Sequence, residues 1–145
     1  MKNQFAAIAL AAFAVVPATI AVAPIACAQV VEASVAVQPS GDFVRKSKRL
    51  KGSYTVIERE GQTIIRFSDD FRAARGPDLK VFLSPNTVAD VNGDTAINGS
   101  INLGVLESTK GGQEYVVPAG VNLDDFASVL VHCEAYAVLW GGSDL

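Results

Sequence analysis

A long apolar run near the C-terminus, residues 128–140, most constrains the fold of this chain. β-Branched and aromatic residues dominate the run and Gly141-Gly142 closes it, a pattern typical of a strand rather than a helix. Because side chains alternate between the two faces of a strand, His132 and Glu134 are expected on a mixed face. The opposite face is predicted to be wholly apolar: Val129, Val131, Cys133, Ala135, Ala137 and Leu139. Such a run belongs in the middle of a sheet.

The segments before this run are short and separated by turn residues. Strand-like runs at 53–59 and 62–67 flank Glu60-Gly61 and predict a hairpin. Further strands are expected at 79–83, 101–106 and 114–117, and Asn122 can cap a single helical turn. No segment has a sustained helical period, so we predict an all-β fold, a β-sandwich or small barrel of short antiparallel strands.

The N-terminus has the pattern of a cleavable export signal. Lys2 is followed by an uncharged apolar segment, and Ala26-Cys27-Ala28 has the small-x-small pattern of a cleavage site. Pro17 and Pro24 interrupt the apolar stretch, which argues against a permanent membrane span. We therefore predict a signal peptide at 1–28, a flexible tether at 29–40 and a β domain at 41–145. This organisation implies an exported protein that is periplasmic, secreted or on the cell surface.

Two alternatives would place the chain at a membrane: a retained signal, or lipidation of Cys27. Ile25-Ala26-Cys27 partly resembles a bacterial lipoprotein box, but Pro24 stands where that box has a leucine-like residue. We therefore prefer cleavage after Ala28.

Charge and cysteine content narrow the function further. Removal of Lys2 with the signal takes the formal net charge from −3 to −4, which argues against a nucleic-acid partner. It also leaves Cys133 as the one cysteine of the mature chain. An unpaired cysteine in an exported protein is either reactive, a ligand or paired with another chain, or else simply a small buried residue.

Two polar segments are interpreted as surface structure and not as binding sites. The basic run at 45–51 predicts a solvated edge strand in preference to a docking patch for an acidic partner. The segment 85–100 contains Asp90-x-Asn92-x-Asp94, a spacing found in calcium loops, but Thr95 occupies the position of the required glycine. We expect a plain surface loop there.

Several short motifs follow one another in a characteristic order: Phe71, Gly76-Pro77-Asp78-Leu79, Leu103-Gly104, Gly112-Gln113-x-Tyr115, and finally Ser128-Val129-x-Val131-x-Cys133 with Tyr136-x-Val138. In these the chain resembles the DM-thirteen domain family, predicted to be an electron-transfer module and often found beside DOMON domains. The resemblance implies a β-sandwich-like fold, and its near-invariant cysteine corresponds to Cys133. That cysteine would be either a redox thiol or a ligand to a prosthetic group such as haem.

The residue inventory limits the chemistry available. Met1 leaves with the signal, so haem ligation by histidine and methionine is excluded, and the C-x-x-C-H motif of covalent haem is absent. One histidine is too few for a blue-copper site in a monomer, and one cysteine too few for iron–sulfur or structural zinc sites. Haem held by a cysteine thiolate remains, as does a lone thiol, although an apolar face slows thiol chemistry.

The surroundings of Cys133 leave two interpretations open. Ala135 and Ala137 leave room beside it on the same face, for a flat ligand or for a bulky side chain from the facing sheet. His132 points to the opposite face and is expected to be partly exposed near Glu134. A nucleophile–base pair is therefore not formed by these neighbours, and an enzyme is disfavoured.

Two functions follow from these observations. The first is an exported redox or electron-transfer module whose single functional residue is Cys133, with haem as the cofactor that it allows and a redox protein as its partner. The alternative is a non-catalytic extracytoplasmic binding or adhesion domain in which Cys133 is buried core.

Overall fold

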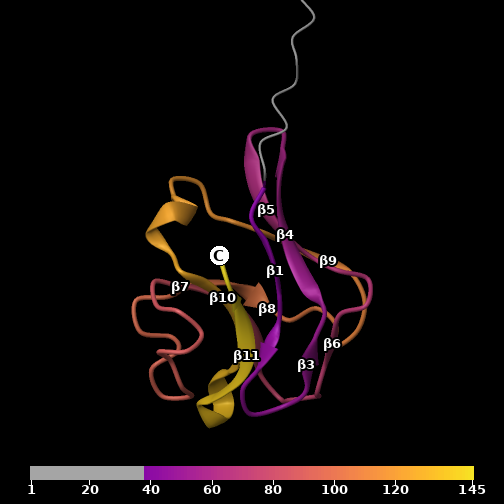
Figure 1. Ribbon diagram of the computed structural model, residues 1–145, viewed down its shortest axis with the longest axis vertical. Helices are drawn as coiled ribbons and strands as arrows, with labels where there is room; N and C mark the ends of the chain where they lie inside the picture. Colours follow the sequence, from indigo (N-terminus) through magenta and orange to yellow (C-terminus); the bar gives the residue numbers. More distant parts are fainter. Residues whose placement is uncertain (1–37) are drawn as a thin grey trace, which may run out of the picture. The chain divides into compact units, whose positions relative to one another are not determined.

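The computed structural model describes residues 38–145, which form two packed antiparallel sheets (Figure 1). The predicted signal peptide and most of the predicted tether lie outside these residues. One sheet has the order β1-β4-β5-β9 and contains Ser40–Asp42, Ser53–Arg59, Gln62–Phe67 and Gln113–Val116. The other has the order β2-β11-β10-β7-β8 and contains Val44–Arg45, Val138–Asp144, Ser128–Cys133, Leu79–Ser84 and Ile101–Val105. A third, two-stranded sheet pairs β3 (Leu50–Lys51) with β6 (Arg72–Ala73). The predicted all-β fold of antiparallel strands is confirmed.

The β4–β5 hairpin forms where the sequence predicts it. Glu60 and Gly61 connect the strands with φ angles of 53° and 75°. Two consecutive residues of positive φ are typical of the tight turn whose twist matches that of the flanking strands. Their register is regular from Arg59↔Gln62 to Tyr54↔Phe67.

The main hydrophobic core lies between the two large sheets. The first sheet contributes Tyr54, Val56, Ile65, Phe67 and Tyr115, and the second contributes alternate residues of β7 and β10. Those alternate residues are Leu79, Val81, Leu83, Val129, Val131 and Cys133. Side chains in between, including Leu130 and Phe82, point to the other face of the second sheet. The period of two predicted for β10 is therefore confirmed from Ser128 to Cys133.

The apolar run 128–140 is a hairpin, so the prediction of one long strand was wrong beyond Cys133. β10 ends at Cys133, a 3-10 turn at Glu134–Tyr136 follows, and Ala137 adopts the left-handed conformation with φ 49° and ψ 47°. Strand β11 then returns beside β10, with Cys133 opposite Val138 and a register shift between Val131 and His132. The reversal moves Leu139 to the face of Leu130, away from Cys133.

The segment 85–100 is a surface loop, as expected, and it also covers the outer face of the second sheet. Its apolar side chains Val88, Val91 and Ala96 are buried in a second core cluster with Phe82, Leu130 and Leu139. Polar bonds hold the loop in place: the Ser128 hydroxyl donates to Asn86 O at 2.7 Å, and the Val88 amide donates to an Asp144 carboxylate oxygen at 2.7 Å. Both faces of β10 are consequently shielded from solvent.

The basic run 45–51 forms the predicted edge strand only in part: Arg45 belongs to β2 and Lys51 to β3, while residues 46–49 lie outside the strands. Strand β2, with Arg45 exposed, is an edge strand of the second sheet. The 3-10 helix Leu123–Asp125 is capped by Asn122, whose side-chain oxygen accepts from the Asp124 amide at 3.2 Å. No helix between residues 38 and 145 has the length and apolar character needed to cross a membrane.

A small polar network lies inside the edge of the core at β9. The Tyr115 hydroxyl donates to Gln113 Oε1 at 2.8 Å and accepts from the Glu107 amide at 3.2 Å. Gln113 in turn bonds the backbone of Ser108 through both ends of its amide, at 3.0 and 2.9 Å. Burial raises the pKa of Tyr115 to about 12, since the phenolate would lose its hydration.

This raised pKa predicts alkaline destabilisation. Between the ordinary tyrosine pKa of 10.0 and about 12, the folded state keeps the Tyr115 proton that the unfolded state has released. The stability from this group is therefore complete below pH 10 and is lost as pH rises toward 12, by up to about 1.4 kcal/mol per pH unit. Urea unfolding between pH 8 and 12 should show a shallower decline for Tyr115→Phe than for wild type. Identical pH slopes for the two proteins would contradict this role of Tyr115.

Candidate functional site

Cys133, the predicted site residue, lies at the end of the central strand β10. It is opposite Leu79 of β7 on one side and Val138 of β11 on the other. Its side chain is 0% exposed and belongs to the main core together with Val129 and Val131. It is the free cysteine of the described residues. The position is therefore interior, although the exposed turn of the hairpin begins at the next residue.

The space expected beside Cys133 is not present. Ala135 and Ala137, which were expected to leave room next to the sulfur, are exposed in the 3-10 turn and its cap. Residues of both large sheets fill the core around Cys133. A haem bound through Cys133 would need a flat space next to the sulfur. The packed core around Cys133 does not provide it.

His132 is buried on the opposite face of the sheet, contrary to the expected partial exposure near Glu134. It is 1% exposed, lies edge-to-face with Phe82 and has Nε2 2.8 Å from the Gly93 carbonyl oxygen. A carbonyl only accepts, so Nε2 carries the proton and donates. Nδ1 is then a buried nitrogen without a partner. His132 thus fastens the 85–100 loop to the sheet and does not contact the face of Cys133.

Glu134 pairs with lysine instead of histidine. The Lys80 ammonium, on the strand next to β10, contacts the Glu134 carboxylate and lies 3.5 Å from Asp78 Oδ2. The hydrogen bond to Glu134 and the neighbouring charge of Asp78 raise the pKa of Lys80. The Glu134 amide also donates to Asp78 O at 3.1 Å. This group of charges ties the start of β7 to the turn that follows Cys133.

Trp140 is a second notable residue of the same core. Its indole Nε1 donates to Ala74 O at 2.9 Å, while its ring is 3% exposed and packs in the cluster that contains Cys133. Trp140 lies two residues after Val138, the residue of β11 that is opposite Cys133. Trp140 is easily noticed in the sequence as the single tryptophan. Its position was not predictable, because the turn at 134–137 moves it to the same side of the sheet as Cys133.

Several turn carboxylates have structural roles. Asp124 and Asp125 lie in the first turn of the 3-10 helix, and Asp70 accepts from the Ser68 hydroxyl at 2.6 Å. Among residues 38–145, no three histidine, cysteine, aspartate or glutamate side chains gather in an arrangement suited to a metal ion.

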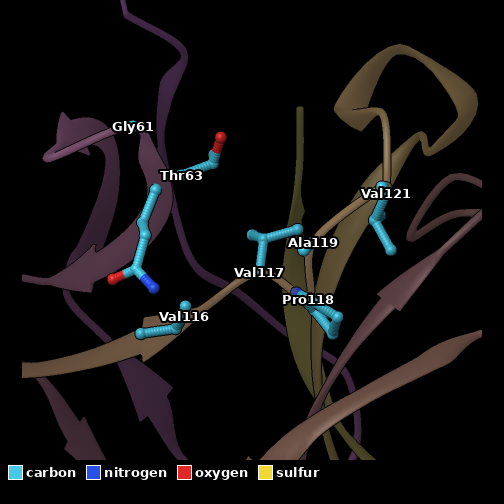
Figure 2. A pocket seen from close by; sticks show the side chains of 9 residues that line it. Gly61, Thr63, Val116, Val117, Pro118, Ala119 and Val121 are labelled. Atoms are coloured by element: carbon cyan, nitrogen blue, oxygen red, sulfur yellow. The ribbon is translucent and has the colours of Figure 1, made fainter.

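A surface groove of about 320 Å³ lies at one end of the first sheet (Figure 2). Its walls are the start of β5 and the chain that leaves β9: Gly61, Gln62, Thr63, Val116, Val117, Pro118, Ala119, Gly120 and Val121. None of these belongs to β7, β10 or β11, so the groove does not open onto Cys133.

Comparison with known proteins identifies the family. No curated protein and no solved structure matches the chain. Residues 42–144, from the end of β1 to the end of β11, match the family described as Electron transfer DM13. The match covers well over half of the chain and includes every strand of the second sheet. The chain belongs to the Electron transfer DM13 family, whose description assigns it a redox role in electron transfer.

Proposed function

We propose that this chain is an exported electron-transfer module that exchanges electrons with a redox partner protein, with Cys133 as its redox-active residue. The family match over residues 42–144 is the observation that carries the proposal. Cys133 is the free cysteine of those residues and so the candidate sulfur for such chemistry.

The burial of Cys133 favours electron transfer over catalysis on a bound substrate. A substrate must reach the reacting atom, and the core closes over this sulfur from both sheets. An electron needs proximity but not contact. Cys133 is immediately followed by the turn Glu134–Tyr136, whose Tyr136 is 69% exposed, so the buried sulfur is close in sequence to a surface.

Export is supported by the N-terminal sequence. The charged start, the apolar segment and the Ala26-Cys27-Ala28 site fit cleavage after Ala28, which would leave Cys133 without an internal partner in an oxidising compartment. A periplasmic, secreted or cell-surface location follows from this proposal.

Cys133→Ala should abolish the redox signal of the mature protein while the fold survives. Truncating one small buried group costs on the order of 1 kcal/mol of unfolding free energy, well below the total stability of a domain. The protein is isolated from its native compartment, and intact-mass analysis identifies its N-terminal residue. Its absorption spectrum and voltammetric response are then recorded. Val131→Ala is the matched control, because it shortens a neighbour on the same face and keeps the thiol.

Two results would refute the assignment to Cys133. One is a full redox response in the folded Cys133→Ala variant. The other is a wild-type protein without any redox response after such isolation. A haem Soret band that Cys133→Ala removes would keep the function but require the core to open around the sulfur.

A non-catalytic extracytoplasmic binding domain is the second candidate. The observation that favours it is the groove of Figure 2, which lies apart from Cys133. In that case Cys133→Ala changes stability alone.

A further inference from the structure

Exposed cations gather on one part of this acidic chain, which we call the basic face. It consists of three segments: the chain from β2 to β3, the chain from β6 to Arg75, and the loop before β9, which contains Lys110. Its members are Arg45, Lys46, Lys48, Arg49, Lys51, Arg72, Arg75 and Lys110. Figure 1 shows β3 and β6 side by side, which brings the first two segments together.

Strand pairing places three of these cations in a row. Lys51 is directly opposite Arg72 in the β3–β6 pair, and Arg72 is bridged in turn to Lys110. The adjacent pair, Leu50 and Ala73, is buried, so Lys51 and Arg72 point outward. Like charges directly opposite one another destabilise a sheet. This row is therefore not accounted for by folding stability.

No carboxylate of residues 38–145 forms an ion pair with the basic face. Within residues 38–145 the ion pairs involve Arg59, Arg66 and Lys80, none of which belongs to the basic face. The Arg72 guanidinium donates instead to the backbone carbonyls of Phe71 at 2.6 Å and of Asp69 at 3.3 Å. The Lys46 ammonium likewise donates to a carbonyl, that of Ala89, at 3.4 Å. The cations of the basic face are thus without a carboxylate partner within the described residues, although the net charge of the chain is negative.

The basic face is bonded directly to Trp140. The Lys46 amide donates to Trp140 O at 2.9 Å, and Arg45 is paired with the next residue, Gly141. Ala74 accepts from the indole of Trp140 at 2.9 Å and donates its own amide to Arg49 O at 2.8 Å. Since Trp140 shares a core cluster with Cys133, a molecule on the basic face lies over that part of the core.

We propose that the basic face docks the acidic surface of a protein redox partner and thereby brings it over Trp140. The proposal rests on the electron-transfer function above. Complementary charge raises association rates and selects partners. A protein fits this face better than a membrane does, because interfacial binding to lipid also draws on buried apolar side chains. Val44 is the one exposed large hydrophobic residue on these segments.

The test is a binding titration of the mature protein with fluorescent polyglutamate at about 0.02 M and at about 0.2 M salt, between which screening increases strongly. The variant Lys51→Glu/Lys110→Glu leaves Arg72 between two carboxylates and should weaken binding by about tenfold or more at low salt. The matched control, Arg59→Glu/Arg66→Glu, changes net charge equally on exposed cations outside the basic face. It should change binding by less than about threefold at low salt.

Each other result overturns the proposal: no polyglutamate binding at low salt, an equal loss in the two variants, or tighter binding to phosphatidylcholine–phosphatidylserine vesicles than to polyglutamate. Thermal unfolding of each variant verifies that it is folded. The control variant Arg59→Glu/Arg66→Glu keeps both Cys133 and the basic face, so its voltammetric signal should equal that of wild type. A wild-type protein without a voltammetric signal contradicts the proposed electron-transfer function. The polyglutamate titration still tests, independently, whether the basic face binds an acidic partner.

Discussion

Phe67→Ala should lower the free energy of unfolding by about 3–5 kcal/mol, the range expected when a large aromatic side chain is deleted from a packed core. Phe67 is 0% exposed at the centre of an aromatic cluster. Its ring centroid lies 4.8 Å from those of Phe43 and Phe71 and 5.1 Å from that of Tyr115. Aromatic pairs of this kind add about 0.5–1.5 kcal/mol each beyond area burial. The substitution removes three such contacts and leaves a cavity between the sheets.

Urea unfolding of wild type and variant measures this loss. Since a domain of this size has a total stability of about 5–15 kcal/mol, the alanine variant can fail to fold. Phe67→Leu then supplies the second measurement, with a smaller loss because it refills part of the cavity. Tyr136→Ala is the control: its ring is exposed, and the change should stay within about 0.5 kcal/mol. A loss below about 1 kcal/mol for Phe67→Ala would mean that this cluster is not the centre of the core.

Gly93→Ala should destabilise the chain by about 1–3 kcal/mol, as overpacking in a closed interior does. A Cβ at position 93 would overlap the Ala137 carbonyl oxygen and come within 3.2 Å of Val138 Cα. Both contacts are backbone, so neither can rotate away as a flexible side chain would. The 85–100 loop must then move off the hairpin, which breaks the bond between His132 Nε2 and Gly93 O.

Hydrogen exchange and thermal unfolding together test this effect. Faster exchange in the segment 85–100 and a lower melting temperature are expected for Gly93→Ala. Asp94→Ala is the matched control, because it changes the adjacent exposed residue without adding a group against the hairpin. Wild-type exchange and melting in Gly93→Ala would show that the loop and the hairpin are not in this close contact.

The sequence predicts an element well where local chemistry dictates it. Glu60-Gly61 specifies the β4–β5 turn through positive φ angles, and alternation specifies which residues of β10 face the core. The turn after Cys133 has no such signal, because Glu134, Ala135 and Tyr136 include no glycine or proline. Its left-handed residue is Ala137, a type seldom found in that conformation. The contacts found at that turn are tertiary: β10 pairs with β7, and Glu134 contacts Lys80 of β7.

The candidate site was predictable only in part. The cysteine count singled out Cys133, the family resemblance suggested its role, and alternation correctly predicted that it faces inward. The burial of His132 was not predictable, because it depends on Gly93, thirty-nine positions away, and on a loop with a polar sequence. The three apolar residues that anchor this loop, Val88, Val91 and Ala96, follow no regular period. The row of cations likewise depends on which strands pair, and so the sequence shows the basic run but not its extension to Arg72 and Lys110.

The lengths of the outermost strands bear on how copies of this chain behave at high concentration. The two large sheets end in β1, β2, β8 and β9, the longest of which is β8 with five residues and a register shift against β7. Three of these strands expose a valine: Val44, Val105 and Val116. Long flat apolar edges would invite one copy to extend the sheet of the next, whereas short and irregular edges offer too few backbone groups in line. Short edges of this kind therefore disfavour extension of a sheet from one copy to the next, even where a valine is exposed.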